Sequence, residues 1–149
     1  MHLWFDISFH GYGHLSQAAE VINACATQHL DLRLTVKCAA PREVIERRIR
    51  VPFTHIQSAS DVTMAMVSAV EVDADASARG YQVFHRDWAR HVADYAALLR
   101  DAAPDVVLAN VAYLPLAAAK RAGIPAAGLC SLNWADILCA LLRRASRSR

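Results

Sequence analysis

The stretch that decides the fold is "DISFHGYGHLSQAAEVINA", residues 6–24. It begins inside a short apolar run (2–8) of β-rich composition. From Leu15 to about His29, apolar residues recur at three- and four-residue spacing. The stretch therefore predicts a strand, a turn with two glycines and an amphipathic helix. Glycines in such a turn permit a positive φ and close backbone approach, and they leave helix N–H groups free for an anion.

The rest of the chain continues this alternation of strands and helices. Short apolar runs predict further strands over residues 32–40, 53–59, 105–111 and 126–131. Helical patterns separate or follow these strands: a short one after Pro41, one over 84–99, one over 113–122 and one from Asn133. The pattern over 84–99 has an aromatic stripe, which we interpret as core. Residues 60–80 show no sustained period, and we expect a loop there.

This order predicts an α/β fold with a doubly wound, mostly parallel sheet, which is Rossmann-like. In such sheets ligands bind beyond the carboxyl ends of the strands. Residues 9–16, 110–115 and 131–136 follow strands, and we expect all three to meet at that edge.

Length and composition narrow the classes of function. The 149 residues fit one domain, predicted over 1–142, with a basic disordered tail over 143–149. A net charge of +2 does not favour a nucleic-acid partner. No apolar window reaches the ~20 residues of a membrane span, and the N-terminus lacks the pattern of a signal peptide. Four cysteines without a framework spacing favour a reducing, cytoplasmic location.

The glycine turn is compatible with more than one ligand. Gly11, Tyr12 and Gly13 supply the G-x-G of a dinucleotide fold, but Ser16 stands where a third glycine is usual. Lys37 ends the next predicted strand and could accept a 2′-phosphate, which keeps an NADP-dependent reductase as an alternative. A P-loop is excluded because no G-x-x-x-x-G-K-[ST] occurs.

His14 is a candidate general base. It lies at the predicted helix start, where the positive end of the helix favours neutral imidazole that can take a proton from a hydroxyl. A carboxylate normally orients such a base, and Asp136 and Asp61 are the candidates. A plain capping role for His14 is the alternative. His10 and His14 alone do not predict a metal site, since spacing places no third ligand.

Two segments resemble a known family. "SFHGYGHLSQAAEVINA" (8–24) resembles the G-H-G-[FY]-G-H-x-[ST]-R segment of a group of GT-B-type glycosyltransferase-like proteins, which includes the N-terminal part of plant L-arabinokinase. "PDVVLANVAYLPLAAAKRAGIPAAGLCSLNWADI" (104–137) resembles a second segment of the same group. The glycine turn also resembles the G-x-x-G-H loop of the undecaprenyl-linked N-acetylglucosaminyltransferase of peptidoglycan synthesis.

The resemblance implies the N-terminal, acceptor-side half of a GT-B glycosyltransferase (EC 2.4 type). Such an enzyme moves a glycosyl group from a nucleotide sugar, its co-substrate, to an acceptor hydroxyl and needs no further cofactor. His14 and Asp136 are the expected catalytic residues. The expected substrate-binding residues are His10, Gly11, Tyr12, Gly13, Ser16, Asn110, Asn133 and Trp134.

This sequence departs from the family in three ways. Gln17 replaces an arginine that commonly follows the helix-start serine, and Asn110 stands where an aspartate is common. No donor-site motif of a second domain is present. We therefore expect a truncated domain, inactive alone, whose donor-binding domain is absent or supplied by a partner. The alternative is a non-catalytic α/β module that binds a sugar or nucleotide, or self-associates through its sheet edge.

Overall fold

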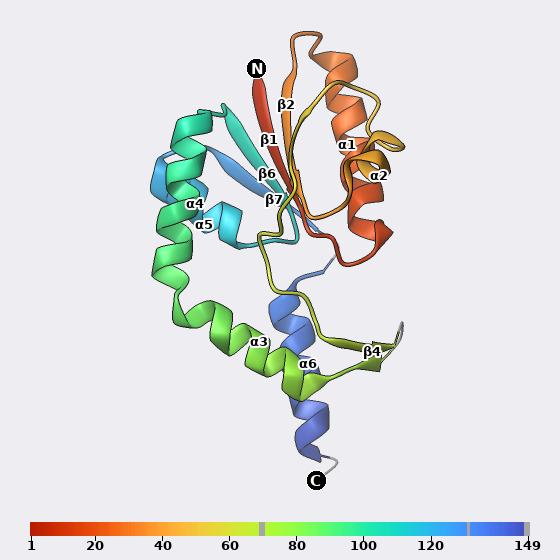
Figure 1. Cartoon of the computed structure of the whole chain (residues 1–149), viewed down its shortest axis with the longest axis vertical. Helices are drawn as coiled ribbons and strands as arrows, with labels where there is room; N and C mark the ends of the chain where they lie inside the picture. Colours follow the sequence, from red (N-terminus) through yellow and green to blue (C-terminus); the bar gives the residue numbers. More distant parts are fainter. Residues whose placement is uncertain (69–70, 131, 148–149) are drawn as a thin grey trace.

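A computed structural model describes residues 1–68, 71–130 and 132–147 (Figure 1). Its main sheet has five parallel strands in the order β3-β2-β1-β6-β7. They are β1 (His2–Ile7), β2 (Arg33–Cys38), β3 (Thr54–Ile56), β6 (Val106–Asn110) and β7 (Ala126–Leu129). The predicted Rossmann-like sheet is confirmed.

Strand β1 lies at the centre of the sheet and is buried along its whole length. Its register aligns Asp6 with Lys37 of β2, and Ile7 with Asn110 of β6. Because neighbouring parallel strands end together, the last residues of β1, β2 and β6 lie side by side at one edge. The site-bearing segments that follow β1 and β6 therefore start next to each other.

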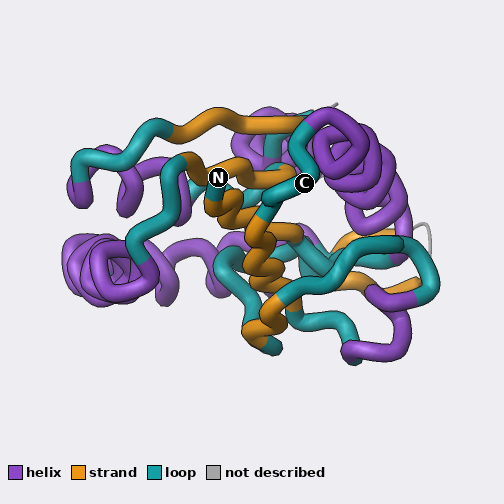
Figure 2. Tube along the Cα trace, turned by 90° about the horizontal axis from the view of Figure 1, so that it is seen from above, coloured by secondary structure: helices purple, strands orange, loops and turns teal. Residues whose placement is uncertain are grey.

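Helices cover both faces of the sheet (Figure 2). On one face, α1 (Tyr12–Gln28) and the short α2 (Arg42–Glu46) pack over a core that includes Phe5, Leu15 and Ile22. On the other face, α4 (Trp88–Ala102) and α5 (Leu114–Ala122) pack over Trp4 and Leu99. Gly123 ends α5 with a φ of 75°, as expected of a glycine that follows the last helical turn.

Residues 60–86 differ from the sequence prediction. They contain an antiparallel hairpin of β4 (Met66–Ser68) and β5 (Glu71–Val72), followed by α3 (Ala74–Arg86). Asp73 caps α3 by accepting a hydrogen bond from the Ala76 N–H at 2.8 Å. The helix predicted over 84–99 is therefore two helices, α3 and α4, which meet at Asp87.

The last helix, α6 (Trp134–Arg147), also differs from expectation. Residues 143–147 belong to it, so that part of the predicted disordered tail is helical; residues 148–149 lie outside the described residues. In the described ranges, no helix combines the length and apolar character needed to cross a bilayer. Strand β7 lies at the edge of the sheet with Ala126, Ala127 and Gly128 exposed, and self-association through it stays a prediction.

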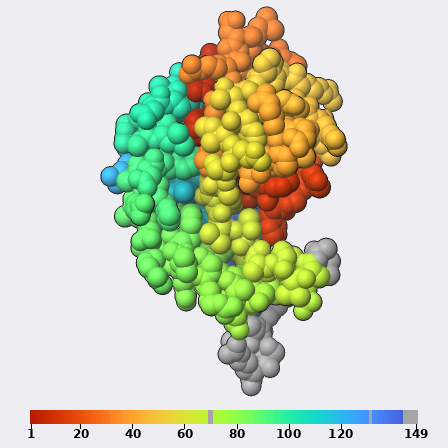
Figure 3. Space-filling view, in the orientation of Figure 1, coloured from red at the N-terminus to blue at the C-terminus, as the bar shows by residue number. Residues whose placement is uncertain are grey.

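A buried polar cluster joins β1, β2 and α4 to the segment after β3. Asp6, only 1% exposed, accepts hydrogen bonds from the hydroxyls of Ser60 (2.8 Å) and Tyr95. Lys37, 5% exposed, donates to Ser60 Oγ at 2.6 Å and to the carbonyl of Ala59 at 3.0 Å. These bonds hold residues 59–60 against the sheet. In Figure 3 the segment after β3 (yellow) crosses this face between α3–α4 and α1–α2.

Burial raises the pKa of Asp6 from 3.8 to about 6, although Lys37, Tyr95 and Ser60 oppose the shift. The folded state thus binds this proton more tightly than the unfolded chain. Its stability should fall as pH rises from about 4 to about 6 and stay constant above. Asp6→Asn should remove this pH dependence. The difference in the free energy of unfolding between wild type and variant should therefore shrink by up to about 3 kcal/mol over that window.

Urea unfolding of both proteins at pH 4 to 6.5 measures this difference. A difference that grows with pH would contradict the stated direction of the Asp6 pKa.

Candidate functional site

The candidate site lies beyond the carboxyl ends of the parallel strands, at the bottom of Figure 1. Here α3, α6 and the hairpin gather below the sheet and enclose a small core of Met64, Tyr81, Val111 and Trp134. The predicted meeting of the segments after β1, β6 and β7 at one edge is confirmed by contacts among His14, Asn110 and Trp134.

The turn after β1 requires glycine at one position. Gly11 has φ 88° and ψ −179°, a region that side chains with a Cβ rarely adopt. Gly13 lies inside α1, and a Cβ at either glycine would meet no atom within 4 Å. The turn therefore presents open backbone. Tyr12 is 62% exposed and packs its ring on Phe9.

The first turn of α1 has little help from side chains. No side chain of the described residues caps this helix at Gly11. Ser16 turns back to donate to the Tyr12 carbonyl at 2.9 Å, so its hydroxyl is engaged within the helix. The helix N–H groups and the positive end of its dipole consequently face the turn.

His14 is held by Asn110 at the end of β6. The side-chain amide nitrogen of Asn110, fully buried, donates to the His14 carbonyl at 3.3 Å. A carbonyl only accepts, so the amide oxygen of Asn110 must face His14 Nδ1, which lies 2.9 Å away. Nδ1 therefore carries the proton, and in the neutral ring Nε2 keeps its lone pair. The arrangement leaves Nε2 able to accept a proton.

The group that orients His14 is thus an amide. Sequence analysis expected a carboxylate, from Asp136 or Asp61; among the described contacts neither bonds to His14. Asp136 and Asn133 instead form a cap at the start of α6: the Asp136 N–H donates to Asn133 Oδ1 at 2.8 Å, and Asn133 Nδ2 donates to the Asp136 carboxylate at 2.6 Å. A catalytic role for Asp136 stays a prediction.

Trp134 is the wall between His14 and the space beside α3. It is 4% exposed, and its ring lies edge-on to His10 (5.3 Å between centroids) and to His14 (5.9 Å). Its indole N–H donates to Asp61 at 3.2 Å. Asp61 thus fixes the tryptophan that borders the histidine, and it does so from the segment held by the buried polar cluster.

The structure argues against a dinucleotide phosphate at Lys37. A 2′-phosphate needs an accessible cation, but Lys37 is buried and its ammonium already donates to Ser60 and Ala59. Burial lowers the pKa of Lys37, and the charges of Asp6 and Asp61 partly oppose this. The sequence-based NADP alternative therefore loses the cation that was expected to bind the 2′-phosphate.

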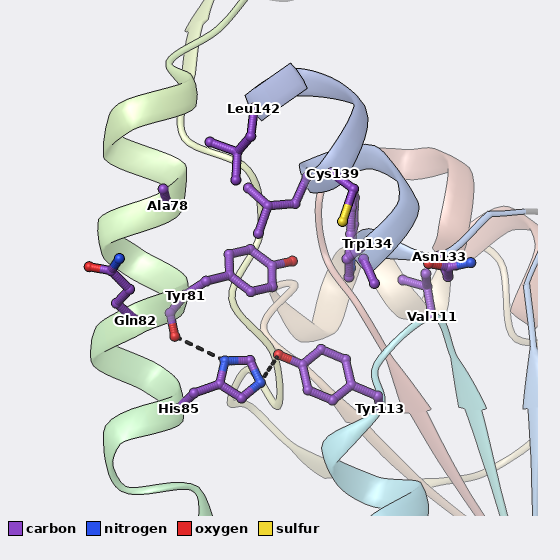
Figure 4. Close-up of a pocket in the computed structure, with 12 residues that line it drawn as sticks. Ala78, Tyr81, Gln82, His85, Val111, Tyr113, Asn133, Trp134, Cys139 and Leu142 are labelled. Carbon is purple, nitrogen blue, oxygen red and sulfur yellow. Dashed lines mark hydrogen bonds between the residues drawn. The ribbon is translucent and has the colours of Figure 1, made fainter. Parts of the chain in front are cut away.

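A cavity of about 560 Å³ lies on the far side of Trp134, between α3, α6 and the segment after β6 (Figure 4). Its walls are mostly apolar and include Ala78, Tyr81, His85, Val111, Tyr113, Trp134, Leu138 and Leu142. Its volume is within the range of small-molecule sites, which are typically apolar with a few polar groups. Sequence analysis missed Tyr81, His85 and Tyr113, although Tyr81 and His85 have the i, i+4 spacing of one helix face.

Two features of the cavity wall carry a cost in stability. Val111 has a φ of 63°, unusual for a β-branched residue. The hydroxyl of Tyr81 is buried and has no hydrogen-bond partner among the described residues. Such exceptions concentrate at functional sites.

Metal ligands do not cluster in the described ranges: no three His, Cys, Asp or Glu side chains come together as a metal site requires. The four cysteines are free thiols. The polar groups around Trp134 are histidine rings, tyrosine hydroxyls, side-chain amides, carboxylates and helix N–H groups.

No family model matches the chain, and no curated protein sequence matches it. Several solved structures share its fold. CalG4, the calicheamicin glycosyltransferase, aligns with a TM-score of 0.59 at 21% identity, over 99% of this chain and 37% of that one. The glycosyltransferase of kitacinnamycin aligns with 0.55 at 20% identity, over 87% and 30%. A UGT transferase from Siraitia grosvenorii, solved in complex with UDP, aligns with 0.52 at 16% identity, over 86% and 27%.

These structural neighbours are GT-B glycosyltransferases, which confirms the expected resemblance at the level of fold. The chain is a five-stranded Rossmann-like unit of the kind that forms one half of a GT-B fold. It spans between 27% and 37% of the length of these neighbours.

The two glycines of the turn should respond differently to alanine. Gly11→Ala should lower the free energy of unfolding by about 1–3 kcal/mol, because the cost is torsional and no clash contributes. Gly13→Ala should leave stability unchanged or raise it by up to about 1 kcal/mol, since alanine favours a helix. Urea denaturation of both variants measures the contrast, and equal effects would contradict the assigned geometry.

The tautomer of His14 is also measurable. In wild type, ¹⁵N NMR should show Nδ1 protonated and Nε2 unprotonated once the ring is neutral. Asn110→Leu, which keeps the branched shape of the side chain but removes both hydrogen bonds, should mix the two tautomers. An Nε2–H form in wild type would contradict the assignment. The exposed His29, at the other end of α1, is the internal control.

Proposed function

We propose that this chain is the acceptor-binding half of a glycosyltransferase that moves a glycosyl group from a nucleotide sugar to an acceptor hydroxyl. The observation that carries the proposal is the His14–Asn110 pair at the carboxyl edge of a parallel sheet, which leaves Nε2 of the histidine as a proton acceptor. The GT-B fold of the structural neighbours is consistent with it.

In this reaction His14 acts as the general base. Its Nε2 takes the proton of the acceptor hydroxyl while the oxygen attacks the anomeric carbon of the donor. The bond between that carbon and the nucleoside diphosphate breaks, and the diphosphate leaves with the electron pair. Asn110 is the positioning residue, since it fixes the ring and its tautomer through two hydrogen bonds.

The turn and the cavity would bind different parts of the two substrates. The N–H groups at the start of α1, with Gly11, Tyr12, Gly13 and Ser16, would face the donor phosphates across the cleft or the oxygens of the acceptor. The apolar cavity would hold the body of the acceptor, with Trp134 between it and His14. His10 and Asn133 flank that tryptophan.

Asn110 limits the base in one respect. An aspartate at this place would stabilise the imidazolium that forms during proton transfer, whereas the neutral amide fixes the tautomer alone. A second candidate follows from this difference: a non-catalytic module that binds the acceptor without transferring to it.

Binding separates these assignments. Titrated against the tryptophan fluorescence of the chain, a hydroxylated apolar acceptor such as 2-naphthol should quench the signal, because Trp134 lines the cavity. NADPH should have no specific effect, and UDP-sugars should bind weakly at most. Tight NADPH binding would overturn the proposal.

Catalysis is tested with the chain fused to the donor-binding half of a GT-B enzyme. The 149-residue chain alone should transfer no measurable sugar. In the active fusion, His14→Ala should lower kcat by roughly 10²–10⁴-fold with unchanged acceptor affinity. His29→Ala, at the exposed far end of the same helix, should leave kcat unchanged. If the unsubstituted fusion binds acceptor but transfers no sugar, the non-catalytic module is the better assignment.

A further inference from the structure

We propose that Tyr81 determines acceptor specificity: its hydroxyl selects a ring-shaped acceptor that carries a carbonyl or ether oxygen. The inference names the substrate class of the cavity and, as far as it concerns an acceptor, rests on the proposed function. It is carried by the state of this one hydroxyl. Tyr81 is 7% exposed, and its Oη is buried without a partner among the described residues.

The Tyr81 side chain is directed toward the place where a ligand would lie. The ring projects from α3 into the cavity, and the hydroxyl points toward α6 and Trp134 (Figure 4). Burial raises the pKa of Tyr81, helped by the nearby Tyr113 and Asp61, so the phenol keeps its proton at neutral pH. The unmet group is therefore an O–H donor. A buried donor without an acceptor is unfavourable, and a ligand oxygen placed there would remove that penalty.

Tyr113, on the same cavity, has the opposite hydrogen-bonding role. His85 Nδ1 lies 2.9 Å from the Tyr81 carbonyl, which only accepts, so Nδ1 is the protonated nitrogen. In the neutral ring, Nε2 must then accept, and the Tyr113 hydroxyl donates to it at 3.1 Å. The Tyr113 oxygen is left with lone pairs only. Burial raises the pKa of Tyr113 to about 12, so it also stays a neutral phenol.

The two phenols thus give the cavity a polarity: Tyr81 offers a donor and Tyr113 an acceptor. The ring of Trp134 and the side chains of Val111, Leu138 and Leu142 supply flat and apolar walls. The matching ligand has an apolar ring body and a carbonyl or ether oxygen for Tyr81, and its acceptor hydroxyl stays free for His14; Tyr113 can accept a further polar hydrogen where the ligand has one. Aromatic hydroxyketones have the ring body, the oxygen for Tyr81 and the hydroxyl for His14, whereas an alkyl analogue lacks the oxygen for Tyr81.

The test compares two probes of similar size, 6-acetyl-2-naphthol and 6-ethyl-2-naphthol, which differ in the carbonyl. Isothermal titration calorimetry of the purified 149-residue chain measures both affinities. Wild type should bind the ketone about 5- to 10-fold more tightly, as expected of one neutral hydrogen bond. Tyr81→Phe should abolish that preference. Tyr113→Phe, the matched control, should change the affinity for both probes about equally, if at all, and keep the preference.

Thermal unfolding tests the premise that the Tyr81 hydroxyl has no hydrogen-bond partner in the described part of the chain. Tyr81→Phe removes an unpaired hydroxyl and keeps the ring, so the thermal midpoint should be unchanged or higher. A lower midpoint would mean that the hydroxyl has a structural partner, and it would overturn the proposal. A ketone preference that survives in Tyr81→Phe, equal binding of both probes to wild type, or binding of neither would overturn it too.

The binding experiment is independent of sugar transfer. A chain that shows the Tyr81-dependent preference but whose fusion transfers no sugar would contradict the proposed function alone. A fusion that glycosylates both naphthols with the same kcat/KM would contradict the specificity inference alone.

Discussion

The arrangement of the site depends on a carboxylate that lies inside the fold, on Asp6. Placing it there is unfavourable, and the hydroxyls and the ammonium around it offset the loss of water. Because Ser60 belongs to this cluster, the long segment after β3 is fixed to the sheet. Asp61 follows directly and holds the indole of Trp134. An interaction at the centre of the sheet thereby fixes a wall of the cavity.

The polar and the mostly apolar parts of the site lie on opposite sides of the Trp134 ring. On one side of Trp134, His14 and the glycine turn offer a proton acceptor and backbone donors. On the other side, the cavity is mostly apolar, and its polar side chains are the two phenols, Gln82, His85 and Asn133. This separation suits the chemistry of adding a sugar to an apolar molecule, since hydroxyl activation needs polar groups and recognition of the body does not.

Much of the fold follows from local patterns, because the apolar segments of strands and the residues that begin and end helices can be recognised from near neighbours in the sequence. The start of α3 was missed although Asp73 is a typical cap, since the hairpin before it has no clear period. Burial of Lys37 could not be read from its strand, where a charged residue at the end suggests exposure. The cavity was missed because α3 and α6, which form it, lie far apart in the sequence.

The central position of β1 has a consequence for how the chain matures. Strand β1 leaves the ribosome well before α4, because Tyr95, which donates to Asp6, is 89 residues further on. At a synthesis rate of ~5–20 residues per second, the Asp6 carboxylate waits about 4–18 s for this partner. Until then, the face of the sheet that α4 later covers stays exposed to water. Packing of α4 (Trp88–Ala102) on this face therefore excludes water from the interior, and it cannot precede the synthesis of that helix.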